Sequence, residues 1–226
     1  MTPQEFCQTL ESTLLVPSAR ENQVEALCRE AAASELFAVC VSPSRVPLAL
    51  KALAGTAVKV VSVAGFPLGT QTTRAKVAEI SELFEVGAHE VDLVMNVGVF
   101  LDGRIASISG EIREARRAAG SGVLKVILET GYLTPAQIRE AASLALGAGA
   151  DFLKTSTGFG PEGARIADVR ILRQVAGKRC GVKAAGGIRS FEQAQSLLAA
   201  GADRLGTSTA GKLLVEARKV LEESSG

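Results

Sequence analysis

Short apolar runs alternate with longer amphipathic stretches along almost the whole chain. The runs are five to eight residues long, are rich in Val, Leu, Ile and Ala, and are separated by turns rich in Gly, Pro and Thr. Runs of that length and composition predict β-strands that are buried on both faces. The predicted strands lie near residues 10–15, 36–42, 58–64, 89–96, 124–130, 151–156, 181–185 and 203–207.

The stretches between these runs follow the three-to-four-residue apolar spacing of amphipathic helices. They are rich in Ala, Glu and Arg, and several carry boundary signals. Thr134-Pro135 sets a capping residue before a proline at the first helical position, and Gly87 follows the end of another stretch. The predicted helices lie near residues 20–34, 44–53, 72–86, 104–119, 134–147, 165–176, 190–200 and 209–221.

Eight strand–helix units in succession predict a parallel sheet that closes into a (β/α)8 barrel, the TIM-barrel fold. The 226 residues suit a single barrel domain over residues 1–226. Residues 2–9 are expected to form an extra N-terminal helix at the bottom of the barrel. An open, doubly wound sheet is the alternative, but no Gly-x-Gly-x-x-Gly motif follows the first strand.

Composition and charge narrow the possible partners. Apolar residues make up 47% of the chain and aromatic residues only 4%, so we expect a core of aliphatic side chains. The formal net charge is +1, which gives no basic surface for nucleic acid or a membrane. No apolar run approaches the ~20 residues of a membrane-spanning helix. The N-terminal residues do not resemble a secretory signal, so a cytoplasmic location is predicted.

Cysteine and histidine spacing gives no sign of a metal site. The four cysteines are Cys7, Cys28, Cys40 and Cys180. None forms a Cys-x-x-Cys pair, and His89 is the only histidine, so we expect reduced thiols and no metal or other cofactor. Within the predicted strands, Cys40 and Glu129 are interpreted as structural.

Three predicted strands carry an ionisable residue inside an otherwise apolar run: Asp92, Lys154 and Lys183. Catalytic groups of such barrels lie at the C-terminal ends of the strands. Neither face of a barrel strand accommodates a lone charge well, so the three groups are expected to be partners of one another. Each residue alone is more commonly structural, for example a lysine whose head reaches water past a helix. The residues by themselves leave both interpretations open.

The functional interpretation has specific chemistry. A lysine is nucleophilic only when neutral, and both desolvation and a neighbouring cation lower its pKa. A nearby carboxylate can transfer protons directly or through water. An amine in that state condenses with a carbonyl to an imine, which withdraws electrons and allows a carbon–carbon bond to break or form.

Two glycine-containing loops suggest a phosphate site. Gly186-Gly187 follows the seventh predicted strand, Gly206-Thr-Ser-Thr follows the eighth, and both open a helix. Backbone N–H groups at these two positions commonly bind phosphate in (β/α)8 barrels. Gly158 follows the Lys154 strand and is expected to line the same pocket. The alternative is that these glycines only form tight turns.

Seven segments, in order and with family-like spacing, resemble deoxyribose-phosphate aldolases. The similarity extends from about residue 10 to residue 215, and the pair KTSTGFG and VKAAGGIR is highly specific. The segments are VCVSP (39–43), GFPLG (65–69), EVDLVMNVG (90–98), LKVILETGYL (124–133), FLKTSTGFG (152–160), VKAAGGIRS (182–190) and ADRLGTS (202–208).

The resemblance implies a class I aldolase that reversibly cleaves 2-deoxy-D-ribose 5-phosphate to D-glyceraldehyde 3-phosphate and acetaldehyde without metal. It implies that Lys154 forms the imine, that Lys183 lowers the pKa of Lys154 and assists proton transfer, and that Asp92 is the acid/base partner. It also implies a homodimer or homotetramer. The substrate- and phosphate-binding residues that it implies are Thr13, Gly158, Gly186, Gly187, Gly206 and Ser208.

The chain departs from the family pattern in its first-strand motif and at its C-terminus. Ser12 and Val16 stand where the family usually has His and Lys, and the chain ends without the terminal Tyr of many members. These departures concern rate, substrate preference and interfaces more than reaction type. Two alternatives therefore remain: a related imine aldolase with a different acceptor, and a non-catalytic sugar-phosphate-binding relative.

Overall fold

Residues 1–223, the part of the chain that the computed structural model describes, form a closed barrel of parallel strands. The strands are β1 (Leu10–Leu14), β2 (Ala38–Val41), β3 (Lys59–Ala64), β4 (Glu90–Val94), β5 (Val123–Ile127), β6 (Phe152–Lys154), β7 (Gly181–Ala185) and β8 (Arg204–Thr207). Each strand pairs with the next along the chain, and β8 pairs with β1. The predicted (β/α)8 barrel is confirmed, and the open-sheet alternative is wrong.

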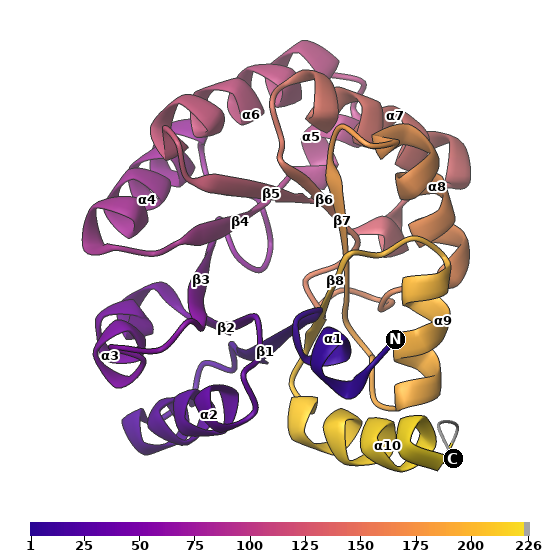
Figure 1. Ribbon diagram of the computed structural model, residues 1–226. Helices are drawn as coiled ribbons and strands as arrows, with labels where there is room; N and C mark the ends of the chain where they lie inside the picture. The colour runs from indigo at the N-terminus through magenta and orange to yellow at the C-terminus, as the bar shows by residue number, and fades with distance from the viewer. Residues whose placement is uncertain (224–226) are drawn as a thin grey trace.

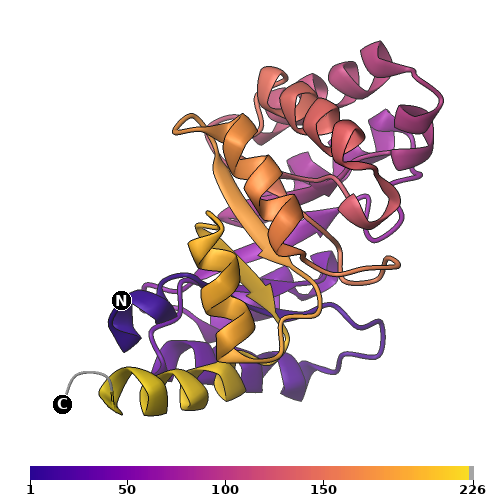
Figure 2. The ribbon, with the colours of Figure 1, turned by 90° about the vertical axis from the view of Figure 1, so that its right-hand side faces the viewer.

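Helices surround the strands (Figures 1 and 2). They are α1 (Pro3–Cys7), α2 (Glu21–Ala33), α3 (Val46–Ala52), α4 (Thr73–Val86), α5 (Val97–Leu101), α6 (Ile105–Ala119), α7 (Pro135–Gly147), α8 (Ile166–Ala176), α9 (Phe191–Ala199) and α10 (Ala210–Glu223), with 3-10 turns η1 (Pro43–Arg45) and η2 (Thr130–Tyr132). Within residues 1–223, no helix combines the length and the apolar character needed to cross a membrane.

Two short elements, α5 and η2, were not predicted from the sequence. Residues 95–96 had been assigned to the preceding strand, but the Asn96 side chain accepts a hydrogen bond from the Val99 backbone N–H and caps α5. The sixth strand also ends two residues before its predicted limit. Beyond it, the backbone N–H of Thr157 binds the side chain of Glu129 in place of a neighbouring strand. Side-chain hydrogen bonds to the backbone thus accompany both differences.

The main hydrophobic core lies between the strands and the helices. It is formed largely by small and branched aliphatic side chains, as the composition predicts. A second, much smaller apolar cluster joins β2 and β3, and consists of Ala38, Cys40, Val61 and Val63. Side chains alternate between the two faces of a strand, so the other strands can direct polar groups to the barrel interior without disturbing the outer core.

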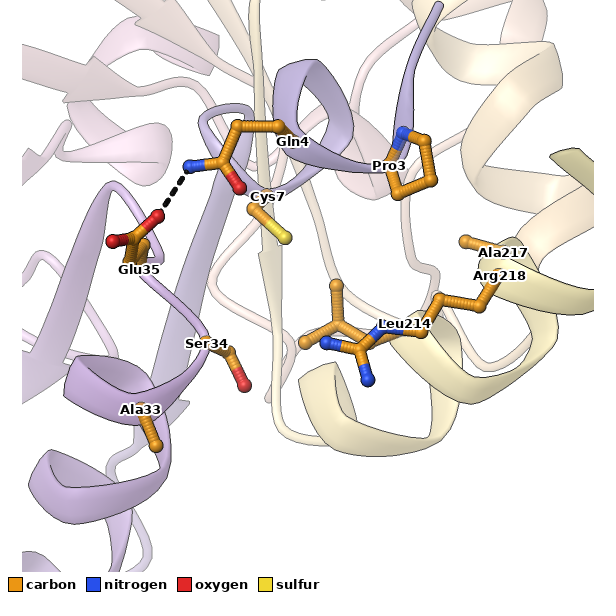
Figure 3. A pocket seen from close by; sticks show the side chains of 9 residues that line it. All are labelled: Pro3, Gln4, Cys7, Ala33, Ser34, Glu35, Leu214, Ala217 and Arg218. Atoms are coloured by element: carbon orange, nitrogen blue, oxygen red, sulfur yellow. Dashed lines mark hydrogen bonds between the residues drawn. The ribbon is translucent and has the colours of Figure 1, made fainter. Parts of the chain in front are cut away.

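Helix α1 lies at the N-terminal end of the barrel, as predicted. The Cys7 carbonyl accepts a hydrogen bond from the Phe37 N–H, and the Thr9 carbonyl accepts one from the Leu205 N–H. The Phe6 ring is buried and meets the Phe191 ring edge-on, with 4.9 Å between centroids. A cavity of about 210 Å³ lies where α1, α2 and α10 meet (Figure 3).

A buried ion pair joins α4 to α6 behind the barrel. Lys76 Nζ lies 2.7 Å from Glu111 Oε1 and donates a second hydrogen bond, of 2.9 Å, to the carbonyl oxygen of Val94 at the end of β4. Both side chains are buried. Burial lowers the pKa of Lys76, and the Glu111 carboxylate opposes that shift. The pair therefore ties two helices to the end of the strand that carries Asp92.

Removing one partner of this pair is expected to cost more stability than removing both. Glu111→Leu leaves the Lys76 ammonium buried without a counter-ion, so the unfolding free energy should fall by about 3 kcal/mol. The double variant Lys76→Met, Glu111→Leu should recover much of that loss, because neither charge is then buried alone. Urea denaturation of the two variants and the wild type measures the difference. A double variant as unstable as Glu111→Leu would contradict this account.

Candidate active site

Charged side chains from six neighbouring strands fill much of the barrel interior. We call this group the charged cluster; its members are Glu11, Glu90, Asp92, Lys125, Lys154, Lys183 and Arg204. All are buried except Arg204, whose side chain is 18% exposed. The apolar cluster lies on the two remaining strands, β2 and β3.

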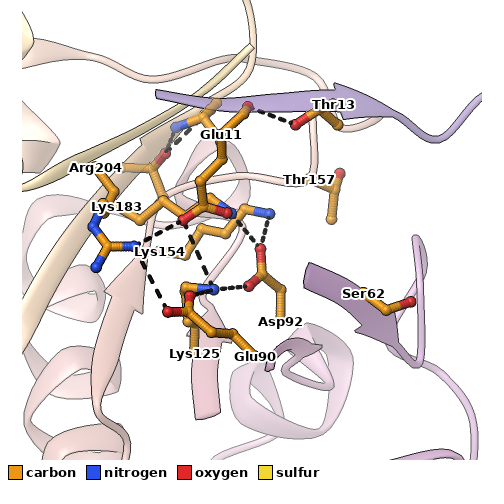
Figure 4. Close-up of polar contacts among 12 residues, drawn as sticks. Glu11, Thr13, Ser62, Glu90, Asp92, Lys125, Lys154, Thr157, Lys183 and Arg204 are labelled. Carbon is orange, nitrogen blue, oxygen red and sulfur yellow. Dashed lines mark hydrogen bonds and ion pairs between the residues drawn. The ribbon is translucent and has the colours of Figure 1, made fainter. Parts of the chain in front are cut away.

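The Asp92 carboxylate is the centre of the charged cluster (Figure 4). Its Oδ2 atom accepts hydrogen bonds from Lys154 Nζ at 2.6 Å and from Lys183 Nζ at 2.7 Å. Its Oδ1 atom accepts one from Lys125 Nζ at 2.9 Å. The structure therefore brings together the three catalytic residues predicted from the sequence, and it adds a third lysine.

Four members of the charged cluster were missed by the sequence analysis. Lys125 lies 2.5 Å from Glu90 and 3.8 Å from Glu11, and Lys183 also pairs with Glu11. The criterion that selected Lys154, an ionisable residue inside an apolar strand, applies equally to Lys125 in the run LKVIL. Arg204 and Glu90 begin their strands and resembled ordinary strand-end charges, so the sequence carried little signal for them.

Electrostatics stabilise the charged forms of most members. Burial alone would raise the pKa of Asp92, but the three surrounding lysines outweigh it and hold that pKa well below its usual range. Burial likewise opposes the charges of Lys125 and Lys183, yet the nearby carboxylates raise the pKa of both lysines. Asp92 is thus a carboxylate, and Lys125 and Lys183 are ammonium ions.

Lys154 differs from the other two lysines. Burial lowers its pKa, the single carboxylate of Asp92 opposes that effect, and the Lys183 charge lowers the pKa further. The net shift is downward, towards the neutral amine. Burial is therefore the largest cause, and the neighbouring lysine that the sequence analysis emphasised contributes less.

A cavity of about 320 Å³ opens over Lys154 at the C-terminal ends of the strands. All six residues proposed from the sequence to bind the substrate or its phosphate line it: Thr13, Gly158, Gly186, Gly187, Gly206 and Ser208. Arg189 also lines it and was not singled out from the sequence. Val16, one of the two first-strand departures, faces the same cavity.

The glycines of this cavity allow close approach of backbone segments. Gly186 has φ +93°, and a Cβ atom there would lie 3.1 Å from Gly163 Cα and 3.3 Å from Gly158 Cα. A Cβ atom on Gly206 would lie 3.2 Å from Lys183 Cε. The first glycine therefore lets two loops meet, and the second leaves space for a lysine of the charged cluster.

Glu129 holds the loop that follows Lys154. Its carboxylate accepts hydrogen bonds from both the N–H and the hydroxyl of Thr157, and Gly160 leaves room for it. Glu129 itself has φ +52°, an unusual conformation for a residue with a side chain. Burial raises its pKa, although Thr157 opposes the shift. The loop carries Gly158 and Phe159, so Glu129 supports one wall of the cavity.

Cys40 lies in the apolar half of the interior, and burial raises the pKa of its thiol to about 11. This neutral thiol is consistent with the structural role predicted for it.

Among residues 1–223, no group of three or more His, Cys, Asp or Glu side chains is arranged to hold a metal ion.

The closed barrel, with a lysine-containing charged cluster beneath a cavity at its C-terminal end, defines an α/β-barrel enzyme. Residues 9–213 match the family model described as DeoC/LacD family aldolase. The chain therefore belongs to that family, and it is an aldolase.

The chain is similar to known proteins over nearly its full length and nearly theirs. The chain is 46% identical over 212 residues to a deoxyribose-phosphate aldolase of Streptococcus mutans serotype c, covering 94% of this chain and 96% of the relative. It is 44% identical over 209 residues to one from Dictyoglomus turgidum, covering 92% and 95%. Among solved structures, the aldolase QR15 has a TM-score of 0.88 and 39% identity, covering 96% of each chain.

One solved relative is described by its assembly. The deoxyribose phosphate aldolase of Aeropyrum pernix, reported with a unique tetrameric structure, has a TM-score of 0.85 and 34% identity. The match covers 97% of this chain and 93% of that one.

The charged cluster is expected to weaken as the pH falls. The folded-state pKa of Asp92 lies below the ordinary value of 3.8, so its stabilising contribution is complete above that value and is lost as the pH falls towards the folded pKa. The unfolding free energy of the wild type should therefore fall more steeply below about pH 4 than that of Asp92→Asn. Urea denaturation at a series of pH values measures both slopes. Asp102→Asn, which removes an exposed carboxylate, should keep the wild-type slope. Equal slopes for wild type and Asp92→Asn would refute this assignment.

Proposed function

We propose that the protein reversibly cleaves 2-deoxy-D-ribose 5-phosphate to D-glyceraldehyde 3-phosphate and acetaldehyde, through an imine on Lys154. One observation carries the proposal. A lysine that is only 3% exposed, with a lowered pKa, lies at the floor of a cavity whose walls are glycine loops. Relatives at 46% and 44% identity are named for this activity.

The first step is imine formation. The neutral Nζ atom of Lys154 attacks C1 of the open-chain sugar, and the carbinolamine loses water to give a protonated imine. The ammonium of Lys183, 2.7 Å from Asp92 Oδ2, can donate the proton that the departing hydroxyl needs. Because Asp92 binds both lysines through this one oxygen, it aligns the nucleophile and the proton donor.

The second step breaks the bond between C2 and C3. Asp92, acting directly or through water, accepts the proton of the C3 hydroxyl. The electron pair of the C2–C3 bond then moves towards the iminium nitrogen, so C3 becomes the aldehyde of D-glyceraldehyde 3-phosphate and C2 becomes an enamine carbon. Return of a proton to C2 regenerates the imine, and water releases acetaldehyde and the Lys154 amine.

The phosphate group is placed by the loops after β7 and β8. Backbone N–H groups at Gly186, Gly187 and Ser208 lie near the starts of α9 and α10, where helix dipoles favour an anion. The Arg189 side chain supplies a positive charge at the cavity wall. A phosphate held there fixes the distance from C5 to C1 and so presents C1 to Lys154.

Two further proposals concern assembly and location. A homo-oligomer, either dimer or tetramer, is supported by the tetrameric relative from Aeropyrum pernix. A cytoplasmic location is supported by the four free, buried cysteines.

Reduction of the protein with borohydride in the presence of acetaldehyde should add one acetaldehyde-derived ethyl group at Lys154. The imine carries an electrophilic carbon, and hydride converts it to a stable secondary amine. Peptide mass mapping locates the site. Lys154→Ala should lose the adduct, whereas Lys212→Ala, which removes an exposed lysine, should retain it. An undiminished adduct in Lys154→Ala would exclude Lys154 as the nucleophile.

The 5-phosphate should increase kcat/KM strongly over unphosphorylated deoxyribose, chiefly by lowering KM. Arg189→Ala should raise KM for the phosphorylated sugar about tenfold, since one charge-assisted contact is lost. It should leave the KM for deoxyribose nearly unchanged, and Arg170→Ala should affect neither substrate. Steady-state kinetics on both sugars decide this. Equal kcat/KM for the two sugars would instead favour an imine aldolase with a non-phosphorylated acceptor, and binding without acetaldehyde release would favour a non-catalytic relative.

A further inference from the structure

The charged cluster extends from one end of the barrel to the other. Lys154 is the last residue of β6 and meets the cavity, whereas Glu90 and Arg204 are the first residues of β4 and β8. Lys154 pairs in register with Lys183, and Lys183 pairs with Arg204. Because barrel strands are staggered, this row of neighbours descends from the C-terminal end of β6 to the N-terminal end of β8. Figure 4 follows the same path from the Lys154 amine to Arg204.

Ion pairs and a cation–π contact join the groups at the N-terminal end. Glu90 lies 2.5 Å from Lys125, which in turn donates to Asp92 at 2.9 Å. Arg204 Nη1 lies 3.7 Å from Glu90 and 3.8 Å from Glu11. Its guanidinium stacks on the Phe37 ring, 3.2 Å from the ring centroid. Glu90 is thus linked to Asp92 through Lys125, and Arg204 is linked to it through a carboxylate, Glu90 or Glu11, and then a lysine.

The charges of the cluster balance only if one basic group is neutral. Three carboxylates, those of Glu11, Glu90 and Asp92, face four bases, those of Lys125, Lys154, Lys183 and Arg204. Arginine keeps its proton in proteins. Lys125 contacts three carboxylates and Lys183 two, but Lys154 contacts only one. The neutral base is therefore Lys154, and protonating it would leave a buried net charge of one.

We propose that Glu90 and Arg204 are positioning residues for the aldol reaction, which hold the Lys154 amine neutral from the opposite end of the barrel. The proposal rests on the function proposed above, because it concerns the nucleophilic form of Lys154. Neither residue lines the cavity, so neither can act by touching the substrate. They act through Lys125, Lys183 and Glu11, by fixing the net charge around Asp92.

The other titratable groups that face Lys154 do not provide this balance. Asp92 from β4 and Lys183 from β7 belong to the cluster and are ionised. Cys40 from β2 is neutral, since burial raises its pKa to about 11. Glu129, beyond β5, is bound to Thr157 in the cavity loop. Of the cluster residues that do not line the cavity, Glu90 and Arg204 are the ones whose side chains pair directly with neither Asp92, Lys154 nor Lys183, so their charges can be varied with the least change around Lys154.

The two residues should shift the protonation of Lys154 in opposite directions. Arg204→Gln removes a positive charge, so a proton on Lys154 restores neutrality and its pKa rises. Glu90→Gln removes a negative charge and leaves the cluster with a net positive charge. A proton on Lys154 would add to that charge, so the pKa of Lys154 falls. The double variant Glu90→Gln, Arg204→Gln loses one charge of each sign, and its pKa should return towards the wild-type value. A purely structural role would not produce opposite shifts that cancel.

The test is the pH dependence of imine trapping with acetaldehyde and cyanoborohydride, followed by mass spectrometry of the full-length protein. The midpoint pH of the trapping rate should rise by roughly half a unit or more in Arg204→Gln, and fall by a similar amount in Glu90→Gln. The double variant should lie within a few tenths of a unit of the wild type. Arg204→Lys, which keeps the charge, should also retain the wild-type midpoint.

A matched control is Arg116→Gln, which removes an arginine from the surface pair with Asp151 and should not move the midpoint. Circular dichroism and thermal melting confirm that each variant is folded, and if Arg204→Gln is not, the fall of the midpoint in Glu90→Gln still tests the proposal. Unchanged midpoints, or shifts of one sign in both single variants, overturn the proposal. Absence of trapping at Lys154 in the wild type would instead overturn the proposed function itself.

Discussion

The rest of the site depends on the hydrogen bonds between the buried carboxylate of Asp92 and three lysines. An isolated carboxylate inside a barrel would be expensive to bury, and so would each of the three lysines around it. Together they are tolerable because each lysine nitrogen hydrogen-bonds an Asp92 carboxylate oxygen at 2.6–2.9 Å. Removing Asp92 would take one counter-charge from both Lys125 and Lys183 and leave them buried with fewer carboxylate partners.

The fold separates the residues of its hydrophobic core from those of the candidate active site. Strand side chains that point outward join the helices in an aliphatic core, and the inward positions of β2 and β3 add a small apolar cluster. That division frees the inward positions of the remaining strands for charge. The Lys76–Glu111 pair is the exception, since it lies outside the sheet yet holds the end of β4 through the Val94 carbonyl.

The eight-unit pattern, the barrel and the extra N-terminal helix could be predicted from the sequence, because strand and helix periodicities and cap residues are local signals. Asp92, Lys154 and Lys183 could also be found, since an ionisable residue in an apolar run is conspicuous. Lys125 met the same criterion and was overlooked. The pairing of Glu90 with Arg204 could not be predicted, because it depends on the stagger of strands four apart in the barrel.

The predicted and observed ends of two strands differ where side chains bind backbone N–H groups. The Asn96 side chain caps α5 locally, three residues before the N–H that it binds, whereas Glu129 binds the N–H of Thr157, 28 residues away. The second kind of hydrogen bond forms only when distant segments are in place, so sequence periodicity cannot reveal it.

The structure also revises the reason for proposing Lys154 as the reactive lysine. Two adjacent lysines would each lower the pKa of the other, so their proximity alone does not decide which one loses its proton. Burial also lowers the pKa of both, but Lys183 has two carboxylate partners and Lys154 has one. The extra partner, Glu11, raises the pKa of Lys183, while burial lowers that of Lys154. Lys154 also opens to the cavity. The two lysines therefore differ because Glu11 pairs with Lys183 and not with Lys154, which leaves Lys154 as the amine with the lowered pKa.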